Sequence, residues 1–352
     1  MKFLKWLAVW ICTFSLGCTF FGCSGADDGT ILFERKNGTL VLSAPTSDCS
    51  AVVYVDGVKK VGTFFVEDKQ IALPKTVFNS SVGKVVCVKI EFLDGQGEVA
   101  SQKEYSVDVV DFAIDTAEEF STWYASYKTT YGLGEYVILT QNITLNGGVI
   151  DNERMAGWLQ WMYTGTFDGR GHVVYNFASV NGFMPNVGKD GCIKNVAFVN
   201  MTTTGAGGFL GKHLCGTVEN CYFQGKQTNT VQNRMFTGFY SRYYDDVNDD
   251  GYVKKVENVV IDVARTSVGV ANDAFSDSNF NKLPSPLPFV NVIMANDSYN
   301  GRAFFQTTPS ADITVYNTSA LMKEEIVRLP EGFSSAYWKI HTKYGFTFAT
   351  RS

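Results

Sequence analysis

A short pattern built around asparagine recurs along the middle of the chain and constrains its fold more than any other feature. Two copies show it best: Ile193–Phe198 reads Ile-Lys-Asn-Val-Ala-Phe, and Val218–Phe223 reads Val-Glu-Asn-Cys-Tyr-Phe. The copies begin 25 residues apart, each shortly after a glycine. Their apolar positions alternate with polar ones, which indicates β-strands, and a repeat of this length is typical of strands stacked turn upon turn. The pattern therefore predicts a solenoid of parallel strands.

Further copies lie on both sides, and their asparagines are spaced by 19 to 38 residues. Such intervals suit a coil of roughly 20 to 25 residues with loops inserted at some turns. An inward asparagine on each coil can hydrogen-bond the asparagines above and below it, which satisfies buried polar groups. We therefore predict a ladder of asparagines. For the outer copies, chance recurrence of a common residue stays open as an alternative. The six positions are Asn142, Asn176, Asn195, Asn220, Asn258 and Asn291.

The region around the first copies carries a family resemblance. Gly165–Phe177 reads Gly-Thr-Phe-Asp-Gly-Arg-Gly-His-Val-Val-Tyr-Asn-Phe, and Gly-Phe-Leu-Gly (Gly208–Gly211) and Gly-Thr-Val-Glu-Asn (Gly216–Asn220) follow it. This stretch resembles the GLUG-motif repeats of bacterial surface proteins, including segments attached to immunoglobulin A1 proteases. The resemblance covers Ile114 to Phe223. It implies a right-handed parallel β-helix, placed here at residues 132–318, on an exported, surface-exposed protein, and it carries over no catalytic residue.

Residues 1–23 have the layout of a secretory signal peptide, because Lys2 and Lys5 precede an apolar run. Cys18 and Cys23 each follow a glycine, which resembles the lipobox of bacterial lipoproteins. We place the lipidated residue at Cys23, since the chain turns polar directly after it. A soluble secreted protein and an uncleaved anchor remain the alternatives. Loss of the two lysines changes the net charge from −5 to −7, which argues against nucleic acid as a partner.

Residues 24–110 contain short alternating strands separated by turn sequences such as Asp56-Gly57. Strands spaced by about ten residues predict an antiparallel β-sandwich, and the segment looks like the Ig-like modules of bacterial surface proteins. Cys49 and Cys87 are predicted to form a disulfide that links its strands, with two buried thiols as the alternative. The expected fold class is thus all-β, with an Ig-like sandwich followed by a capped parallel β-helix.

Residues 111–131 interrupt the β pattern and predict one amphipathic helix. Thr116 and Glu119 form a capping box, and four aromatic residues follow at helical spacing. Such a helix would cover the first coil, whose open end exposes unpaired strand edges. Residues 319–352 are predicted to cap the far end similarly, with a short helix at 319–326 and aromatic cover from Phe333, Tyr337 and Trp338.

Catalytic motifs are few, which favours a binding protein over an enzyme. The chain has three histidines, no Gly-x-Ser-x-Gly elbow and no His-Glu-x-x-His. Asp168 is interpreted as part of an Asp-Gly turn. Zinc binding and a Cys192–Cys215 disulfide were weighed against plain core cysteines. The residues weighed for zinc are Cys192, His213, Cys215 and Cys221.

Adhesion through glycan or protein binding is therefore the expected function. Aromatic side chains on two inserts are the predicted ligand-binding residues, since aromatic faces stack on sugars and proteins alike. For the first insert, the alternative is that Trp158 and Trp161 simply cover the coil beneath them. The rival function is a polysaccharide lyase or glycoside hydrolase, whose candidate residues are Asp151, Glu153, Arg154, Arg170 and Lys212. The predicted ligand-binding set is Trp158, Trp161, Tyr163, Tyr240, Tyr243 and Tyr244, and the expected partner is a host or environmental glycan or a surface protein.

One insert predicts a structural calcium site. Residues 246–257 satisfy the pattern D-x-[DN]-x-[DN]-G-x5-E in full. Calcium binds six to eight oxygens, which carboxylates, an amide oxygen and a backbone carbonyl of this loop would supply. A solvated acidic loop is the alternative, because the flanking segments are β-like and Lys254 occupies loop position 9. The predicted ligands are Asp246, Asn248, Asp250, Tyr252 and Glu257.

Overall fold

The structure is a computed structural model, and its secondary structure is mostly β. The chain divides into two compact units that meet between Asp111 and Phe112, one residue from the predicted boundary. The described residues are 29–47, 49–129, 134–152, 162–205, 208–228, 234–239, 254–265, 273–276, 289–294, 316–317, 333–341 and 345–348.

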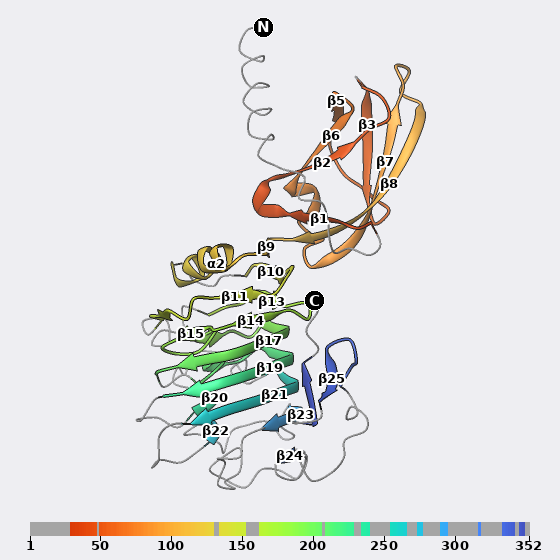
Figure 1. The fold of residues 1–352 in the computed structure, drawn as a ribbon. Helices are drawn as coiled ribbons and strands as arrows, with labels where there is room; N and C mark the ends of the chain where they lie inside the picture. The colour runs from red at the N-terminus through yellow and green to blue at the C-terminus, as the bar shows by residue number, and fades with distance from the viewer. Residues whose placement is uncertain are drawn as a thin grey trace, which may run out of the picture. The chain divides into compact units, whose positions relative to one another are not determined.

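The first unit is one continuous sheet (Figure 1). Its order is β1-β8-β7-β3-β5-β6-β2, with β4 paired to β3. All pairs are antiparallel except β1 with β8. The strands are β1 (Ile31–Glu34), β2 (Thr39–Ser43), β3 (Ser50–Val55), β4 (Val58–Lys59), β5 (Phe64–Glu67), β6 (Gln70–Pro74), β7 (Lys84–Leu93) and β8 (Val99–Val110), with 3-10 turns η1 (Arg35–Asn37) and η2 (Lys75–Phe78).

This sheet nearly closes into a barrel around a single core. Every second residue of β2, β3 and β6 is buried, as the alternating sequence predicts. The Tyr105 hydroxyl of β8 donates to the Ser43 carbonyl of β2, so β2, at one end of the strand order, contacts β8, the neighbour of β1 at the other end. Arg35 also pairs with Asp111 at 2.7 Å, which ties the segment after β1 to the end of the unit.

The predicted disulfide between Cys49 and Cys87 is wrong, because both thiols are free. The register of β3 against β7 explains why. Ser50 lies opposite Leu93, whereas Val55 lies opposite Val88, so the two cysteines are at opposite ends of the antiparallel pair. A rise of about 3.3 Å per residue puts them far beyond the reach of a disulfide. Cys87 is also exposed, so the alternative of two buried thiols does not hold either.

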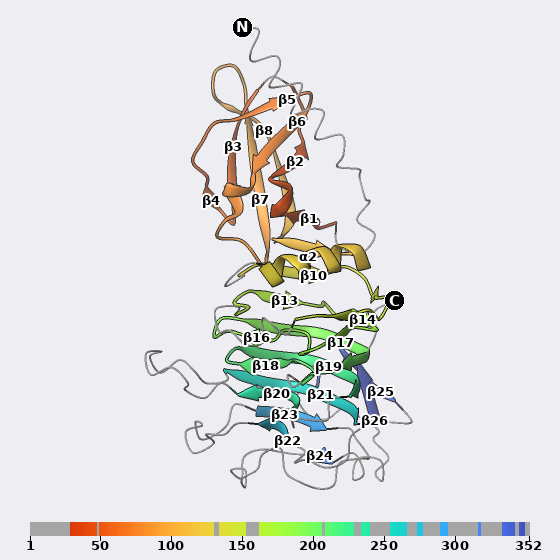
Figure 2. The same cartoon turned by 90° about the vertical axis from the view of Figure 1, so that its left-hand side faces the viewer.

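The second unit consists of parallel strands that alternate between two sheets (Figures 1 and 2). One sheet has the long strands in the order β9-β10-β13-β17-β19-β21-β23-β24, with β11, β12, β14 and β15 beside them, and the other has β16-β18-β20-β22. The chain visits the sheets in turn, as stacked repeats require. The bounds are β9 (Phe112–Ile114), β10 (Tyr136–Leu139), β11 (Ile143–Thr144), β12 (Val149–Ile150), β13 (Thr166–Asp168), β14 (Val173–Tyr175), β15 (Ala178–Ser179), β16 (Asn186–Val187), β17 (Cys192–Thr203), β18 (Gly211–Leu214), β19 (Thr217–Gln227), β20 (Arg234–Phe239), β21 (Lys255–Arg265), β22 (Asp273–Ser276), β23 (Phe289–Met294) and β24 (Tyr316–Asn317).

The recurring asparagines mark bends rather than one uniform series. Asn195, Asn220 and Asn258 have φ values of 53°, 50° and 54°, in the left-handed region that asparagine tolerates better than most residues. Each Nδ2 donates to the side chain on the preceding turn: Asn258 to Asn220 (3.1 Å) and Asn220 to Asn195 (3.2 Å). The predicted ladder is therefore confirmed for these three residues.

Two outer copies of the pattern belong elsewhere. Asn176 (φ 60°) lies at a second bend, where it accepts a 2.7 Å hydrogen bond from Asn200. Asn142 instead accepts the Val173 amide at 2.9 Å. The prediction of a single ladder was wrong for these two positions, because the turn has two left-handed bends and the sequence pattern does not distinguish them.

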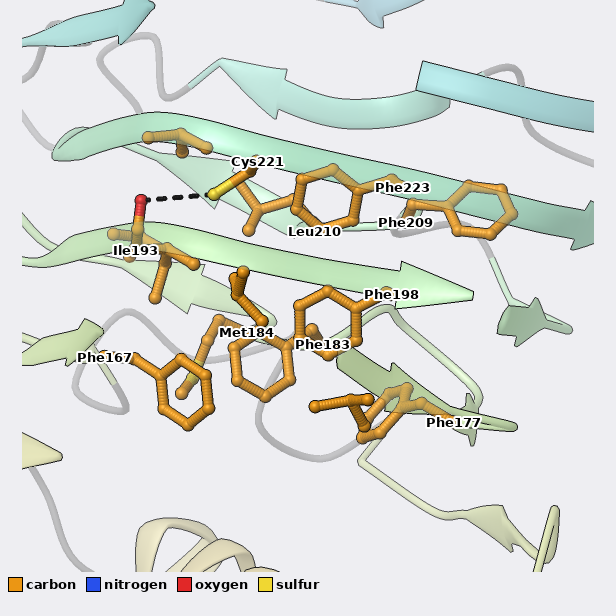
Figure 3. Close-up of a cluster of buried hydrophobic side chains, with 14 of the residues drawn as sticks. Phe167, Phe177, Phe183, Met184, Ile193, Phe198, Phe209, Leu210, Cys221 and Phe223 are labelled. Carbon is orange, nitrogen blue, oxygen red and sulfur yellow. Dashed lines mark hydrogen bonds between the residues drawn. The ribbon is translucent and has the colours of Figure 1, made fainter. Parts of the chain in front are cut away.

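The interior between the sheets is filled by aligned apolar side chains (Figure 3). Phe198 pairs in register with Phe223, and their rings stack with centroids 5.4 Å apart. Val196 pairs with Cys221, so Cys221 points inward as predicted; its thiol donates to the Ile193 carbonyl at 3.6 Å. The segments that lead into β16 and β18 contribute Phe183 and Phe209, and the Phe183 amide donates to the Phe209 carbonyl at 2.9 Å. Equivalent apolar side chains of successive repeats therefore stack on one another in the interior.

Helix α2 (Ala117–Thr129) packs on one end of this interior, as predicted. Thr116 Oγ1 accepts the Glu119 amide (3.1 Å), as in a capping box, and Glu119 Oε2 reaches back to accept the amide of Asp115, the residue before the cap (2.9 Å). The helix buries four aromatic rings completely or nearly so, and Tyr124 donates to the Phe183 carbonyl at 2.6 Å. The four rings are Phe120, Trp123, Tyr124 and Tyr127.

The C-terminal residues do not cover the end of the stack where the sequence places them. Phe333 and Trp338 pack against the outer side of the long sheet, on Val173, Ala197 and Val260. Strand β25 (Trp338–His341) forms a hairpin with β26 (Gly345–Phe348), which lies against β19 (Figure 2). The prediction of an end cap by these aromatics was wrong, because the outer side has its own apolar strip. The predicted helix at 319–326 lies outside the described residues.

Candidate functional site

The first part of each long strand presents a polar face on the outside of the stack. Side chains two residues apart share this face, while the residues between them, such as Ile193 and Val218, are buried. The register stacks Asp168, Lys194, Glu219 and Glu257 in one column. We call the whole set the outer polar face: Tyr136, Thr166, Asp168, Cys192, Lys194, Thr217, Glu219, Lys255 and Glu257.

Three side chains form the best-defined cluster on this face. Tyr136 donates its hydroxyl to Asp168 Oδ2 at 3.1 Å, and Lys194 Nζ lies 3.4 Å from the same oxygen. The Lys194 ammonium also lies over the Tyr136 ring, 5.6 Å from its centroid, where a cation–π attraction operates. The Lys194 side chain is 29 % exposed and that of Asp168 is 9 % exposed. The cluster therefore presents a tyrosine and a lysine to solvent above a buried carboxylate.

Asp168 performs a structural task in this cluster. Its Oδ1 accepts the Arg170 amide and the Asn195 Nδ2, both at 2.9 Å. The first bond closes the Asp-Gly turn, which confirms the interpretation of Asp168 as a turn residue. The second makes Asp168 the first member of the asparagine ladder. Both oxygens of the Asp168 carboxylate are therefore engaged within the stack.

Lys255 joins the next two turns of the face. Its Nζ pairs with Glu257 and lies 3.6 Å from Glu219 Oε2. Glu257 thus occupies an outward position of the strand register, as the repeat indicates. To bind calcium as predicted, the Glu257 carboxylate would have to leave its ion pair with Lys255. The other predicted calcium ligands, Asp246, Asn248, Asp250 and Tyr252, lie outside the described residues. Within the described part of the chain, no three His, Cys, Asp or Glu side chains gather to hold a metal.

The electrostatics of the face favour the protonated forms of Tyr136, Lys194 and Lys255. Burial raises the pKa of Tyr136, and Asp168 raises it further. Burial alone would lower the pKa of Lys194, but the attraction of Asp168 and Tyr136 outweighs it, so that this pKa is also raised. The hydrogen bond that Lys255 donates to the Glu257 carboxylate raises the pKa of Lys255. None of these three groups is thereby prepared to remove a proton near neutral pH, because a general base needs a pKa close to the working pH.

The cysteines and histidine weighed for zinc do not converge. Cys221 points inward, whereas Cys192 stacks with Thr217 on the outer face. Burial raises the pKa of Cys192 to about 11 and that of Cys215 to about 12, which disfavours the thiolates that zinc requires. All the described cysteines are free, so the alternative of a Cys192–Cys215 disulfide was also wrong. Cys215 and Cys221 are instead core residues.

Tyr163 is not a ligand-binding residue, and this prediction was wrong. Its side chain is fully buried. The ring packs edge-on against Trp123 and Tyr127 of helix α2, and its hydroxyl donates to the Glu135 carbonyl at 3.0 Å. A bridge to Val187 aligns Tyr163 with the short sheet, so the residue begins a turn of the stack instead of lying on an exposed insert.

The other predicted ligand-binding residues, Trp158, Trp161, Tyr240, Tyr243 and Tyr244, lie outside the described residues. The described strands nevertheless fix where their segments leave the stack. Trp158 and Trp161 fall between β12 and Tyr163, on the path from the long sheet to the short one. The three tyrosines fall between β20 and β21, on the return path. The two aromatic groups therefore fall in different sequence segments between the described strands, and the second segment precedes β21 in the sequence.

The residues weighed for catalysis are likewise spread around the turn. Arg170 (φ 50°) lies at the bend between β13 and β14. Asp151 follows β12, and Lys212 lies on the short strand β18. Glu153 and Arg154 lie outside the described residues. The described candidates thus occupy three different elements and form no common catalytic face.

Sequence reasoning missed Tyr136 and Lys194, the most defined pair on the outer polar face. The alternation did place Lys194 outward, but nothing in the sequence showed which tyrosine on another turn would stand beside it.

None of the described helices has the length and apolar content that crossing a bilayer requires. Comparison with known proteins gave no matching family model, no matching curated protein and no matching solved structure.

Proposed function

We propose that the protein is an exported, lipid-anchored bacterial surface protein whose second unit is a right-handed parallel β-helix with GLUG-like repeats. The parallel pairing of successive long strands and the asparagine ladder support the β-helix. The first unit is proposed as an Ig-like module, which the predominantly antiparallel strands favour. Its role is to space the second unit from the membrane. The resemblance of Ile114–Phe223 to surface-protein repeats is the basis for the location.

The proposed activity is adhesion, through binding of a glycan or a surface protein to the outer polar face. The observation that carries it is the cluster of Tyr136, Asp168 and Lys194 on stacked strands. Tyr136 is partly exposed and contributes an aromatic group beside Lys194, and the lysine offers donors for hydroxyl or carboxylate groups. Stacked strands hold these groups rigidly, which limits the entropy lost on binding. Tyr240, Tyr243 and Tyr244, which precede β21 in the sequence, stay part of the proposal as predicted ligand-binding residues.

A polysaccharide lyase or glycoside hydrolase is the alternative function. Such an enzyme needs a base, or a pair of carboxylates with different proton affinities. On the outer polar face the carboxylates are paired with lysines, and the pKa values of Tyr136 and Lys194 are raised. This pattern favours binding over catalysis.

The test is a parallel screen of the purified mature chain on glycan arrays and on polyuronates. We expect retention of a defined glycan class and no new unsaturated or reducing ends. The Tyr136→Ala and Lys194→Ala variants should each lose binding, whereas Lys103→Ala in the first unit serves as the matched control. Release of unsaturated or reducing ends that Arg154→Ala or Arg170→Ala abolishes would overturn the binding-only proposal.

The proposed anchor has its own test. Diacylation of Cys23 would hold the chain at a membrane far more firmly than one acyl chain does. Changing Cys23 to Ser should abolish incorporation of labelled fatty acid and release the protein into the medium. Retention of the variant in the membrane fraction would instead favour Cys18 or an uncleaved anchor.

A further inference from the structure

The outer side of the long sheet changes character along each strand. Its first part is the outer polar face, but after the asparagine bend the outward positions are apolar or aromatic. Val173, Ala197, Tyr222 and Val260 are aligned in register across β14, β17, β19 and β21. Tyr175 and Val199 form a second aligned pair. We call these six residues the outer strip. Its Val173, Ala197 and Val260 are at most 3 % exposed, although they point away from the interior.

The C-terminal strap, residues 333–341, covers this strip. Phe333 is 6 % exposed and Trp338 is 1 % exposed, and the two rings meet edge-to-face with centroids 4.9 Å apart. Both rings pack on the strip, and Tyr337 packs beside them. Because neighbouring strands are about 4.8 Å apart, cover across four strands extends over roughly 14 Å of the stack. The contacts between the strap and the strip join residues that are distant in sequence.

Such a contact has a particular effect in a solenoid. Each turn of a repeat protein contacts only its neighbours, so turns near one end can open while the others stay folded. A segment that binds several turns at once couples their opening, because releasing one turn then uncovers apolar surface on the others. The strap binds β14 and β17 on one side and β21 on the other.

We infer that the C-terminal strap is a latch that makes the turns from β14 to β21 open together rather than one by one. This inference does not depend on the proposed adhesion. It assigns residues 333–341 a conformational role, in which Trp338 holds the far turns of the stack to the near ones. Helix α2 and strand β10, which lie on the other side of β13 in the stack, are outside the latch.

Hydrogen exchange measured by mass spectrometry on the full chain tests the latch. In the wild type, the amides of β17, β19 and β21 should exchange at similar rates. In Trp338→Ala, β19 and β21 should exchange at least about tenfold faster, while β10 and α2 keep their protection. Trp338→Phe, which keeps a ring on the strip, should behave nearly as the wild type. Phe65→Ala, at a ring of the first unit that is 67 % exposed, is the control.

Val260→Ala examines the same contact from the strip and removes less volume than Trp338→Ala. It should accelerate the same peptides to a smaller extent. Unchanged exchange of β19 and β21 in both variants would overturn the latch. So would equal acceleration of β10, α2 and β21, because the strap would then add stability without coupling particular turns. Should Trp338→Ala not fold, Val260→Ala alone decides between these outcomes.

Discussion

Replacing Asn220 by Ala should destabilise the second unit through two separate losses. The side chain donates to Asn195 and accepts from Asn258, and a net contribution of about 1 kcal/mol per hydrogen bond gives about 2 kcal/mol. The backbone has φ 50°, where a residue with a Cβ and no local polar group pays about 1 kcal/mol. The expected loss is therefore about 3 kcal/mol.

Two further substitutions separate these contributions. Asn220→Gly removes both bonds but tolerates the backbone angle, so it should cost about 2 kcal/mol. Asn220→Asp keeps an acceptor for Asn258 and loses only the donor, so it should cost about 1 kcal/mol. The predicted order of stability is wild type, Asp, Gly, then Ala.

Urea unfolding followed by tryptophan fluorescence measures this order. After residue 23 the tryptophans are Trp123, Trp158, Trp161 and Trp338, so the signal reports the second unit and is silent for the first. Equal stabilities of the Ala and Gly variants would refute the backbone part of the reasoning. A loss below about 0.5 kcal/mol for all three variants, the range of ordinary surface changes, would refute the ladder as a source of stability.

Three more outcomes follow from the structure. Gly216→Ala should cost about 4 kcal/mol or more in urea unfolding followed by circular dichroism, which reports both units, because an added Cβ would lie 2.1 Å from the Gly191 carbonyl; Gly95→Ala in the first unit, with nothing within 4 Å, should be neutral in the same assay. Thiol labelling of the native protein, read by mass spectrometry at mildly alkaline pH, should modify exposed Cys87 first and leave Cys215 and Cys221 unmodified until denaturation, and early labelling of Cys221 would contradict its inward position. The second unit should lose stability above about pH 10.5. The pKa of Lys194 is raised in the folded state, so the stability that Lys194 contributes is complete below its unfolded pKa and is lost as the pH rises through its folded pKa. The raised pKa of Tyr136 changes the stability in the same direction. Urea midpoints at neutral and alkaline pH should therefore fall less in Lys194→Met than in the wild type, and equal falls would contradict the argument.

Local sequence patterns predicted the parts of the fold that depend on neighbours in the chain. The 25-residue repeat placed Ile193 beside Val218 and Val196 beside Cys221, because identical turns bury identical positions. The Thr116–Glu119 capping box and the aromatic spacing from Phe120 to Tyr127 placed helix α2, because both patterns lie within one short stretch of the chain.

The misplaced elements depend on contacts between distant segments. The prediction of a disulfide was wrong because the register of β3 against β7 determines which residues face each other. The spacing of the cysteines in the sequence does not reveal that register. Phe333 and Trp338 were correctly predicted to cover apolar surface, but the local sequence does not show which apolar surface they cover. Tyr163 lies in an aromatic stretch that looks like an insert, and only the pairing with Val187 shows that it belongs to the stack.

The central claim is that the outer polar face binds a ligand without chemical change, and one titration tests it most directly. The glycan that the array retains is titrated calorimetrically into the wild type and into Tyr136→Ala, and the ligand is recovered and analysed afterwards. We predict saturable binding by the wild type, at least about tenfold weaker binding by the variant if the ring contributes 1.4 kcal/mol or more, and ligand recovered intact. Equal affinity of the two proteins, or recovery of cleaved ligand from the wild type, would contradict the claim.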